Sequence, residues 1–228
     1  MNRGPIIAID GPAGAGKSTV ARHVAQHFGL LYLETGAMYR AFALKAIVSD
    51  QDFEDAASLE RLARSTQITL EADRASNRVY LDGQDVTERI RDADVTQSAS
   101  RVSVHPGIRK WMVDLQRELG RKGGVVMEGR DIGSVVFPHA DLKVFLDASP
   151  EVRAGRRQRE LEEKGEPLEF EKVLEEVRIR DRRDREREMS PLVRAADAVM
   201  VDNTAMDAEE TARAIVLLAR EKARAAAG

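Results

Sequence analysis

The feature that most constrains this chain is residues 11–18, which read GPAGAGKS and fit the pattern G-x-x-x-x-G-K-[ST] at every fixed position. Glycines let the backbone curl so that successive N–H groups line one concavity at the start of a helix, where they bind phosphate groups. An ordinary glycine-rich turn is the alternative. The flanking sequence favours the motif, because residues 5–10 predict a buried strand and residues 17–28 a helix.

The motif predicts a nucleoside triphosphate ligand. Its lysine reaches the outer phosphates, and its serine hydroxyl is a ligand for Mg²⁺. We therefore expect Ser18 to bind the metal and the triphosphate to be held by Gly11, Pro12, Ala13, Gly14, Ala15, Gly16, Lys17, Ser18 and Thr19.

Composition limits the class of protein. The chain has 228 residues, of which 43% are hydrophobic, and this is enough for a core in one domain with an inserted subdomain. It has no cysteine, which excludes disulfides, thiolate catalysis and cysteine-based zinc sites. The sequence shows no signal segment and no run approaching 18 apolar residues. We expect a soluble cytoplasmic protein with no membrane partner.

Short apolar runs alternate with longer amphipathic segments, which is typical of parallel strands joined by crossover helices. The predicted strands are residues 6–10, 30–33, 124–127, 142–146 and 198–201. The predicted helices are residues 17–28, 38–48, 106–119, 150–164, 170–187 and 208 onward. The sequence therefore predicts an α/β fold of three layers, with a parallel five-stranded sheet flanked by helices.

Residues 67–71 and 78–82 break this alternation, because both have the period of two expected of strands and residues 75–77 form a turn between them. We expect a small antiparallel insert at about residues 50–94. It would interrupt a single domain of residues 1–228, whose core comprises residues 1–49 and 95–228.

Two polar clusters follow predicted strands, at the sheet edge where α/β proteins bind ligands. TGAMYR at residues 35–40 follows the second strand, and Arg40 could hold an anion. EGRDIG at residues 128–133 follows the third strand and brings Arg130 and Asp131 near the phosphates. A purely structural ion pair is the alternative for these two residues.

Six arginines fall within residues 178–187. Alone, such a run is typical of a solvated helix with many salt bridges. One face of this helix, at i, i+3, i+4 and i+7, carries Arg180, Arg183, Asp184 and Arg187. Phosphoryl transfer needs such a face, since charge spreads over three oxygens and water must be excluded. We therefore expect a helical lid at about residues 153–188.

These motifs resemble those of the bacterial cytidylate kinases, P-loop nucleoside monophosphate kinases that transfer the γ-phosphate of ATP to CMP or dCMP. The resemblance covers almost the whole chain, and the antiparallel insert also fits it. Its most specific element is G-R-D-x-G-[ST]-V-V-x-P, which most P-loop kinases lack. The segments that carry it, in the family's order, are GPAGAGKST at 11–19, TGAMYR at 35–40, SASRVSVHPGIR at 98–109, EGRDIGSVVFP at 128–138, FLDAS at 145–149 and RDREREMSPL at 183–192.

The resemblance implies a role for each matching residue. Acceptor phosphate would be bound by Arg40, Arg130 and Arg187. Cytosine would be surrounded by Ser100, Arg109 and Asp131, the sugar would contact Asp184, and the acceptor site would also include Thr35 and Tyr39. The catalytic residues would be Lys17, Arg130, Arg180 and Arg187, with Arg153 and Arg157 as helpers that bind ATP.

Chemistry supports the assignment of the base. Cytosine offers an amino donor beside two acceptors, so the carboxylate of Asp131 and the guanidinium of Arg109 complement it. Uracil would leave buried groups unpaired, and purines would be too large. The chain departs from the family at Glu128, usually Asp, and at Thr35, usually Ser. The first change bears on the organisation of Mg²⁺, and the second bears on acceptor affinity or on the preference between CMP and dCMP.

We expect direct in-line transfer with no covalent enzyme intermediate. The acceptor oxygen is already an anion near neutral pH, so positioning and charge neutralisation replace a general base. The other possibilities are a kinase with another acceptor, a nucleotide-driven switch and an RNA-binding module. A guanine-specific switch normally carries N-K-x-D, which is absent, and 4% aromatic residues offer little for RNA stacking. We expect ATP and Mg²⁺ as co-substrate and cofactor, CMP and dCMP as partners, no nucleic acid, and a monomer.

Overall fold

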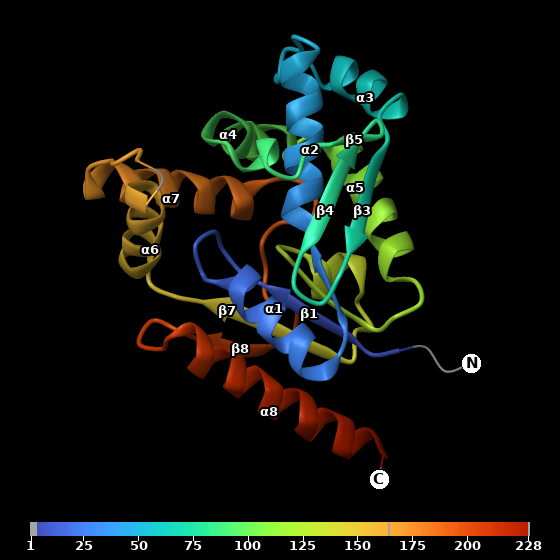
Figure 1. The fold of residues 1–228 in the computed structure, drawn as a ribbon, viewed down its shortest axis with the longest axis vertical. Helices are drawn as coiled ribbons and strands as arrows, with labels where there is room; N and C mark the ends of the chain where they lie inside the picture. The colour runs from blue at the N-terminus through green and yellow to red at the C-terminus, as the bar shows by residue number, and fades with distance from the viewer. Residues whose placement is uncertain (1–3, 164, 228) are drawn as a thin grey trace.

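The computed structural model of the chain describes residues 4–163 and 165–227. The ends of the predicted domain, residues 1–3 and 228, lie outside the described residues, as does residue 164 at the end of a predicted helix. Figure 1 shows a central sheet covered by helices, with a second small sheet on one side of α2 and the helices α6 and α7 on the other.

Five parallel strands form the central sheet in the order β2-β6-β1-β7-β8. Their bounds are β1 Ile6–Asp10, β2 Leu31–Glu34, β6 Val125–Gly129, β7 Leu142–Asp147 and β8 Val199–Asp202. The α/β class and the five predicted strands are thereby confirmed.

Both faces of this sheet are buried, which explains why its strands read as continuous apolar runs. Successive side chains of a strand point to opposite faces. Ile7 and Ile9 pack in one cluster with α1 (Lys17–Phe28) and α8 (Ala208–Ala227). Ile6 and Ala8 pack in another with α2 (Thr35–Val48) and α5 (Pro106–Gly120). The sheet is thus the middle of three layers (Figure 1).

The segment predicted to be an insert, about residues 50–94 and called the insert below, contains the predicted antiparallel pair as β3 (Ile68–Ala72) and β4 (Asn77–Leu81). It also contains three elements that the sequence did not predict, α3 (Ala56–Arg64), β5 (Gln84–Asp85) and a 3₁₀ turn at Arg89–Arg91.

The insert is joined to the edge strand β2 through Asn77. The Asn77 side chain accepts a hydrogen bond from the Glu34 N–H (2.8 Å) and donates one to the Tyr32 carbonyl (2.7 Å). The Tyr32 N–H donates to the Asp73 carbonyl at 2.9 Å. The insert therefore satisfies backbone groups that an edge strand leaves unpaired.

The segment predicted to be a lid, about residues 153–188 and called the lid below, is formed mainly by α6 (Pro150–Glu163) and α7 (Phe170–Glu186). These helices pack against each other at the left of Figure 1. They share a small apolar core of their own, made by Ala154, Leu161, Val173, Leu174 and Val177.

One predicted helix start was wrong, and one predicted helix ends a residue earlier than expected. Helix α2 begins at Thr35, three residues before the predicted start, and the Thr35 hydroxyl donates to the Glu128 carbonyl at 2.8 Å. Helix α7 ends at Glu186, because the Asp184 carbonyl accepts the Leu192 N–H (2.8 Å) instead of the next helical N–H. Arg187 is therefore extended (φ −61°, ψ 142°) and does not lie on the predicted helical face. The sequence also missed α4 (Ala93–Val102) and a π-helical turn at Ile132–Val136.

Candidate active site

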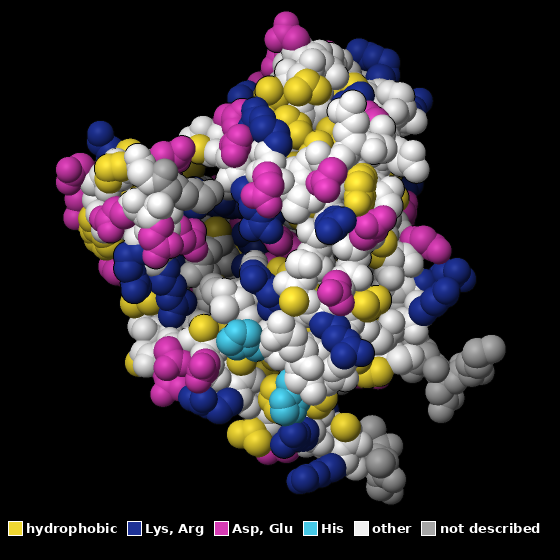
Figure 2. Space-filling view, viewed as in Figure 1, with side chains coloured by type: hydrophobic (Ala, Val, Ile, Leu, Met, Phe, Trp, Pro, Cys, Tyr) yellow, Lys and Arg dark blue, Asp and Glu magenta, His cyan; other side chains and the backbone are white. Residues whose placement is uncertain are grey.

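A cavity of about 1600 Å³ lies between the P-loop (residues 11–18), the lid and the helices α2 and α4. Figure 2 shows the hollow between the lid and the body of the molecule, with Lys and Arg side chains inside it. It lies beyond the carboxyl ends of β1, β2 and β6, where open α/β sheets bind ligands.

The P-loop connects β1 to α1 as predicted, and its glycines are required by space. A Cβ on Gly11 (φ 151°) would lie 1.9 Å from the Leu146 carbonyl oxygen, and Gly14 (φ 74°) packs against Arg153. In the described part of the chain no side chain caps the N-terminus of α1, and a helix start without a cap is a common binding site for phosphate. Three residues of the P-loop, Gly11, Pro12 and Ala15, are buried and do not line the cavity. The cavity is lined by the other P-loop residues and by the residue that follows the loop, namely Ala13, Gly14, Gly16, Lys17, Ser18 and Thr19.

Lys17 is buried, and its Nζ donates to the Pro12 carbonyl at 2.7 Å. Burial, helped by the charge of Arg130, lowers the pKa of Lys17 from its ordinary value of 10.5 to about 7. The side chain therefore gains its full positive charge at neutral pH only when a negative group comes close.

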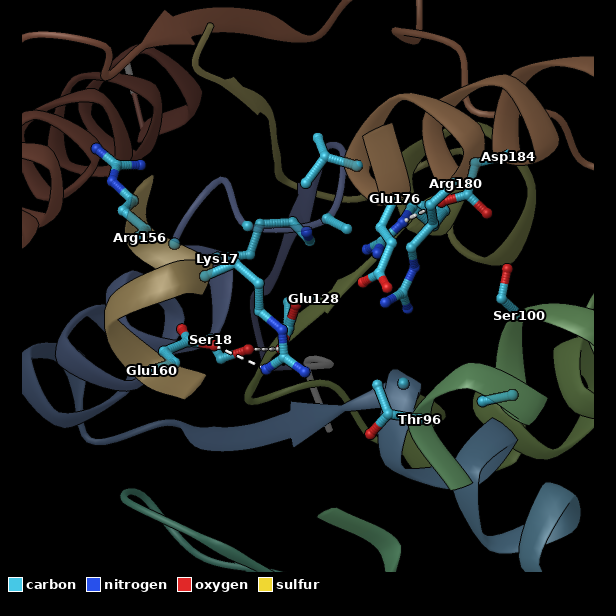
Figure 3. Close-up of a pocket in the computed structure, with 18 of the residues that line it drawn as sticks. Lys17, Ser18, Thr96, Ser100, Glu128, Arg156, Glu160, Glu176, Arg180 and Asp184 are labelled. Atoms are coloured by element: carbon cyan, nitrogen blue, oxygen red, sulfur yellow. Dashed lines mark hydrogen bonds and ion pairs between the residues drawn. The ribbon is translucent and has the colours of Figure 1, made fainter. Parts of the chain in front are cut away.

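Glu128, at the end of β6, lies beside the P-loop serine. Ser18 Oγ donates to Glu128 Oε1 at 2.5 Å, and the Tyr32 hydroxyl donates to the same oxygen at 3.2 Å. Tyr32 is buried in β2, and burial followed by the charge of Glu128 raises its pKa, which keeps the hydroxyl protonated. The carboxylate is thus held from two sides with its oxygens near Ser18. Figure 3 shows Lys17, Ser18 and Glu128 together at one side of the pocket.

Arg109 and Asp131 form a buried ion pair on the opposite wall. Arg109 Nη2 donates to Asp131 Oδ2 at 2.6 Å, and both residues are almost fully buried. The Arg109 guanidinium also lies over the ring of Tyr39, 5.5 Å from its centroid. These contacts fix a carboxylate and a guanidinium side by side. They belong to the two residues that the family resemblance assigned to cytosine, and that assignment stays a prediction.

Among the described residues, several donor atoms on side chains that line this cavity are buried and make no hydrogen bond within the protein. Burying a donor unpaired costs about 1–3 kcal/mol, so such groups call for an explanation. The unpaired atoms of residues that line the cavity are the Tyr39 hydroxyl, Arg40 Nε, Arg109 Nε, Arg180 Nε and Arg187 Nη2. The side chains that carry these atoms include four guanidinium groups, whose positive charge suits a negatively charged ligand.

Asp184, on α7, forms ion pairs with Arg130, which follows β6, and with Arg187. Arg130 Nε donates to Asp184 Oδ2 at 2.9 Å, and Arg187 lies 3.6 Å from the same carboxylate. Burial alone would raise the pKa of Asp184, but Arg130, Arg180 and Arg187 outweigh it and lower that pKa. Burial and the charge of Arg130 lower the pKa of Arg180 to about 10. Several cations are therefore concentrated at this wall, and such a concentration of positive charge attracts anions.

Arg40, from the first turns of α2, forms an ion pair with Glu34. Ser100, on α4, accepts a hydrogen bond from Arg183 Nη1 at 2.9 Å. Figure 3 shows Ser100 across the pocket from α7, which carries Arg180 and Asp184. The predicted acceptor residues all line the cavity, namely Thr35, Tyr39, Arg40, Ser100, Arg109, Arg130, Asp131, Asp184 and Arg187.

The two predicted helpers differ. Arg157 lines the cavity, whereas the guanidinium of Arg153 is buried beside the P-loop. It pairs with Asp181 through two hydrogen bonds (2.9 and 2.6 Å) and also donates to the Ala13 carbonyl at 3.1 Å. A contact between Arg153 and ATP stays a prediction.

Arg156 and Asn203 are among the cavity residues that the sequence did not predict. Arg156 donates to the Asn203 side chain and carbonyl, and Asn203 donates to the Ala15 carbonyl at 2.9 Å. These contacts join α6, the segment after β8 and the P-loop, which are far apart in the sequence. No local pattern distinguished Arg156 from the arginines around it.

Among the described residues, no helix is long and apolar enough to cross a membrane, and no group of three or more His, Asp or Glu side chains is arranged to hold a metal ion.

Comparison with known proteins decides the family. The sequence model of the cytidylate kinase family matches residues 7–221. The chain belongs to the cytidylate kinase family. A cytidylate kinase from Pelotomaculum thermopropionicum is 51% identical over 95% of this chain and 96% of its own length. A cytidylate kinase from Desulfitobacterium hafniense is 46% identical over 97% of this chain and 95% of its own. Membership makes this chain an ATP-dependent nucleoside monophosphate kinase.

The fold is also found in a distant structure. The structure of an uncharacterized protein from Eubacterium ventriosum superposes on this chain with a TM-score of 0.52 at 12% sequence identity. The superposition covers 95% of this chain and 98% of the Eubacterium protein. This likeness concerns the fold alone.

Proposed function

We propose that this member of the cytidylate kinase family transfers the γ-phosphate of ATP to CMP or dCMP, giving ADP and CDP or dCDP. The observation that carries the proposal is the set of guanidinium donors on residues that line the cavity, combined with the ion pair of Arg109 and Asp131. The donors match phosphates, and the ion pair matches the edge of cytosine.

ATP binds with its phosphates on the P-loop, where the free N–H groups of α1 and the Lys17 ammonium meet negative charge. Phosphate binding favours the charged form of Lys17 and releases it from the Pro12 carbonyl. The proposed contacts are the P-loop residues 11–18, Thr19 and the helpers Arg153 and Arg157.

The residues near the P-loop serine fit Mg²⁺, because a hydroxyl and a carboxylate supply the oxygen ligands that this ion prefers. Ser18 would bind the ion directly, and Glu128, 2.5 Å from that hydroxyl, would hold its water ligands. When bound, Mg²⁺ neutralises charge on the β- and γ-phosphate oxygens.

CMP lies against the opposite wall. Arg40, Arg130 and Arg187 bind its phosphate, and Asp184 meets the sugar. Asp131 accepts a hydrogen bond from the cytosine amino group, and Arg109 donates to the ring acceptors. Ser100, Thr35 and Tyr39 complete this site.

In the transfer step, an oxygen of the CMP phosphate attacks the γ-phosphorus, the bond to the bridging oxygen breaks, and ADP leaves. The attacking oxygen is an anion near neutral pH, so no side chain has to remove a proton. Lys17, Arg130, Arg180 and Arg187 stabilise the charge of the transferring group, and closure of the lid keeps water away. Positioning and charge neutralisation therefore account for the rate.

The experiment is a measurement of ADP formation from ATP and Mg²⁺ with CMP, dCMP, UMP, AMP, GMP or no acceptor. We expect rapid turnover with CMP or dCMP and little with the others. Turnover only with another monophosphate would overturn the base assignment, and hydrolysis without any acceptor would overturn the transfer reaction. The monomeric state and the cytoplasmic location stay predictions.

A further inference from the structure

A buried asparagine that is distant in sequence from the P-loop binds one of the loop's carbonyl groups. Asn203 follows β8, and its Nδ2 donates to the Ala15 carbonyl at 2.9 Å. A Cβ placed on Gly16 would lie 3.7 Å from the same Nδ2. The asparagine side chain therefore packs directly against the peptide that joins Ala15 to Gly16.

The side-chain amide of Asn203 is held in one orientation. Arg156 Nη1 donates to Asn203 Oδ1 at 3.3 Å. An arginine has donors only, so the amide oxygen must face Arg156 and the amide nitrogen must face Ala15. The backbone of Asn203 is fixed as well, because its carbonyl accepts from Arg156 Nη2 (2.9 Å) and its N–H donates to the Asp147 carbonyl (2.8 Å). Asn203 is thus a fixed donor beside the P-loop.

This contact bears on the direction of a backbone N–H. A trans peptide is planar, so the Ala15 carbonyl and the Gly16 N–H point in opposite directions. Gly16 has a φ of 85°, and without a Cβ it could adopt a negative φ as readily. Rotation of this peptide would exchange the places of the carbonyl oxygen and the N–H. The hydrogen bond from Asn203 opposes that rotation.

We propose that Asn203 is a positioning residue for ATP, which holds the Ala15 carbonyl and so keeps the Gly16 N–H directed at the phosphates. This proposal rests on the proposed ATP site. Gly16 lines the cavity, whereas Ala15 is buried and does not. An N–H donates to a phosphate oxygen, but a carbonyl oxygen in the same place would repel it. The asparagine therefore acts on ATP through the backbone of the loop.

Asn203 differs in charge from two other side chains that bind P-loop carbonyls. Lys17 Nζ donates to the Pro12 carbonyl at 2.7 Å, and Arg153 Nη1 donates to the Ala13 carbonyl at 3.1 Å. Both are cations, which the charge of a bound triphosphate attracts, and Lys17 leaves Pro12 in the proposed complex. An uncharged amide has no comparable attraction to phosphate. The contact of Asn203 therefore stays in place when ATP binds.

The test is the dissociation constant for ATP, measured without CMP, in Asn203→Leu and Asn203→Ala. Leucine has the branched shape of asparagine but no donor, and alanine removes both the donor and the volume. We expect each substitution to weaken the binding of ATP and of inorganic triphosphate about tenfold, as for loss of one hydrogen bond to a charged group. The dissociation constant for CMP, measured without ATP, should stay at the native value. Thermal unfolding shows which variants fold, and either variant alone decides if the other does not.

Asn77→Ala is the matched control, because Asn77 is also a buried asparagine that binds backbone groups, but it lies in the insert and does not line the cavity. It should leave the dissociation constant for ATP unchanged. Native ATP binding in the Asn203 variants would overturn the inference, and so would an equal loss of CMP binding, which would mean a general loss of structure. Weaker binding of ATP with native binding of inorganic triphosphate would also overturn it, because Asn203 would then contact the nucleoside. Failure of the native chain to bind ATP would instead overturn the proposed function.

Discussion

Arg153 and Asp181 join the two helices of the lid and connect both to the P-loop. The guanidinium on α6 meets the carboxylate on α7 in a two-pronged ion pair, and both side chains are almost completely buried. The same guanidinium donates to the Ala13 carbonyl. The position of the lid is therefore tied to the loop that binds phosphate.

Asp181→Asn should destabilise the protein by about 3 kcal/mol, because it leaves the buried Arg153 charge without its partner. Urea unfolding measures this loss. Asp114→Asn, in an exposed and long ion pair with Arg117, is the matched control and should change stability by less than about 0.5 kcal/mol. Equal losses of unfolding free energy in the two variants would show that the buried ion pair contributes no more to stability than an exposed one.

ATP binding should take up a proton on Lys17. Its pKa of about 7 in the free protein lies below the ordinary value of 10.5, so the amine is mostly neutral at about pH 8 and charged at about pH 6. Phosphates raise this pKa on binding. Calorimetry in buffers of different ionisation enthalpy should find uptake approaching one proton at about pH 8 and little at about pH 6.

Lys17→Arg is the control for this measurement, because a guanidinium stays charged throughout this range. Burial raises the pKa of Asp10 to about 7, so Asp10 can also exchange a proton when ATP binds. Subtracting the proton uptake of Lys17→Arg from that of the native chain removes this contribution. Equal proton uptake by the native chain and Lys17→Arg at about pH 8 would argue against a neutral lysine.

Tyr32→Phe should raise the Mg²⁺ concentration needed for half-maximal activity about fivefold, the equivalent of one hydrogen bond of about 1 kcal/mol. The variant removes a donor to Glu128 without touching Ser18. Tyr80→Phe, which removes an exposed hydrogen bond to Glu71 in the insert, should leave the Mg²⁺ titration unchanged. If both titrations equal that of the native chain, Tyr32 does not position Glu128.

Asp131→Asn should lower kcat/KM for CMP about 100-fold and lower that for UMP much less. The amide keeps the shape of the carboxylate but offers a donor, which suits the O4 of uracil. Asp197→Asn, at an exposed partner of Lys143, is the control. A proportional loss with both acceptors would mean that Asp131 supports the site without reading the base.

The fold was largely predictable, because a strand that is covered on both faces is a short run of apolar residues in the sequence. Strand β1 is an example, since all five of its residues are buried. Helix α4 was not, since residues 93–102 are rich in Ser and Thr and become helical through the packing of Val95, Ala99 and Val102. The location of Arg40, Arg130 and Asp131 followed from strand ends, whereas Ser100 and Arg109 were named only because of the family resemblance. The contacts Tyr32–Glu128 and Ser100–Arg183 could not be predicted, because tertiary packing chooses partners 96 and 83 residues apart.

The two hydrogen bonds between the Asn77 side chain and β2 have a consequence for association between copies of the chain. An open edge strand is a template on which another strand can add, and such addition is a common start of aggregation. By occupying the Tyr32 carbonyl and the Glu34 N–H, Asn77 takes the place of a neighbouring strand. The insert therefore also protects one border of the central sheet against pairing with a second molecule.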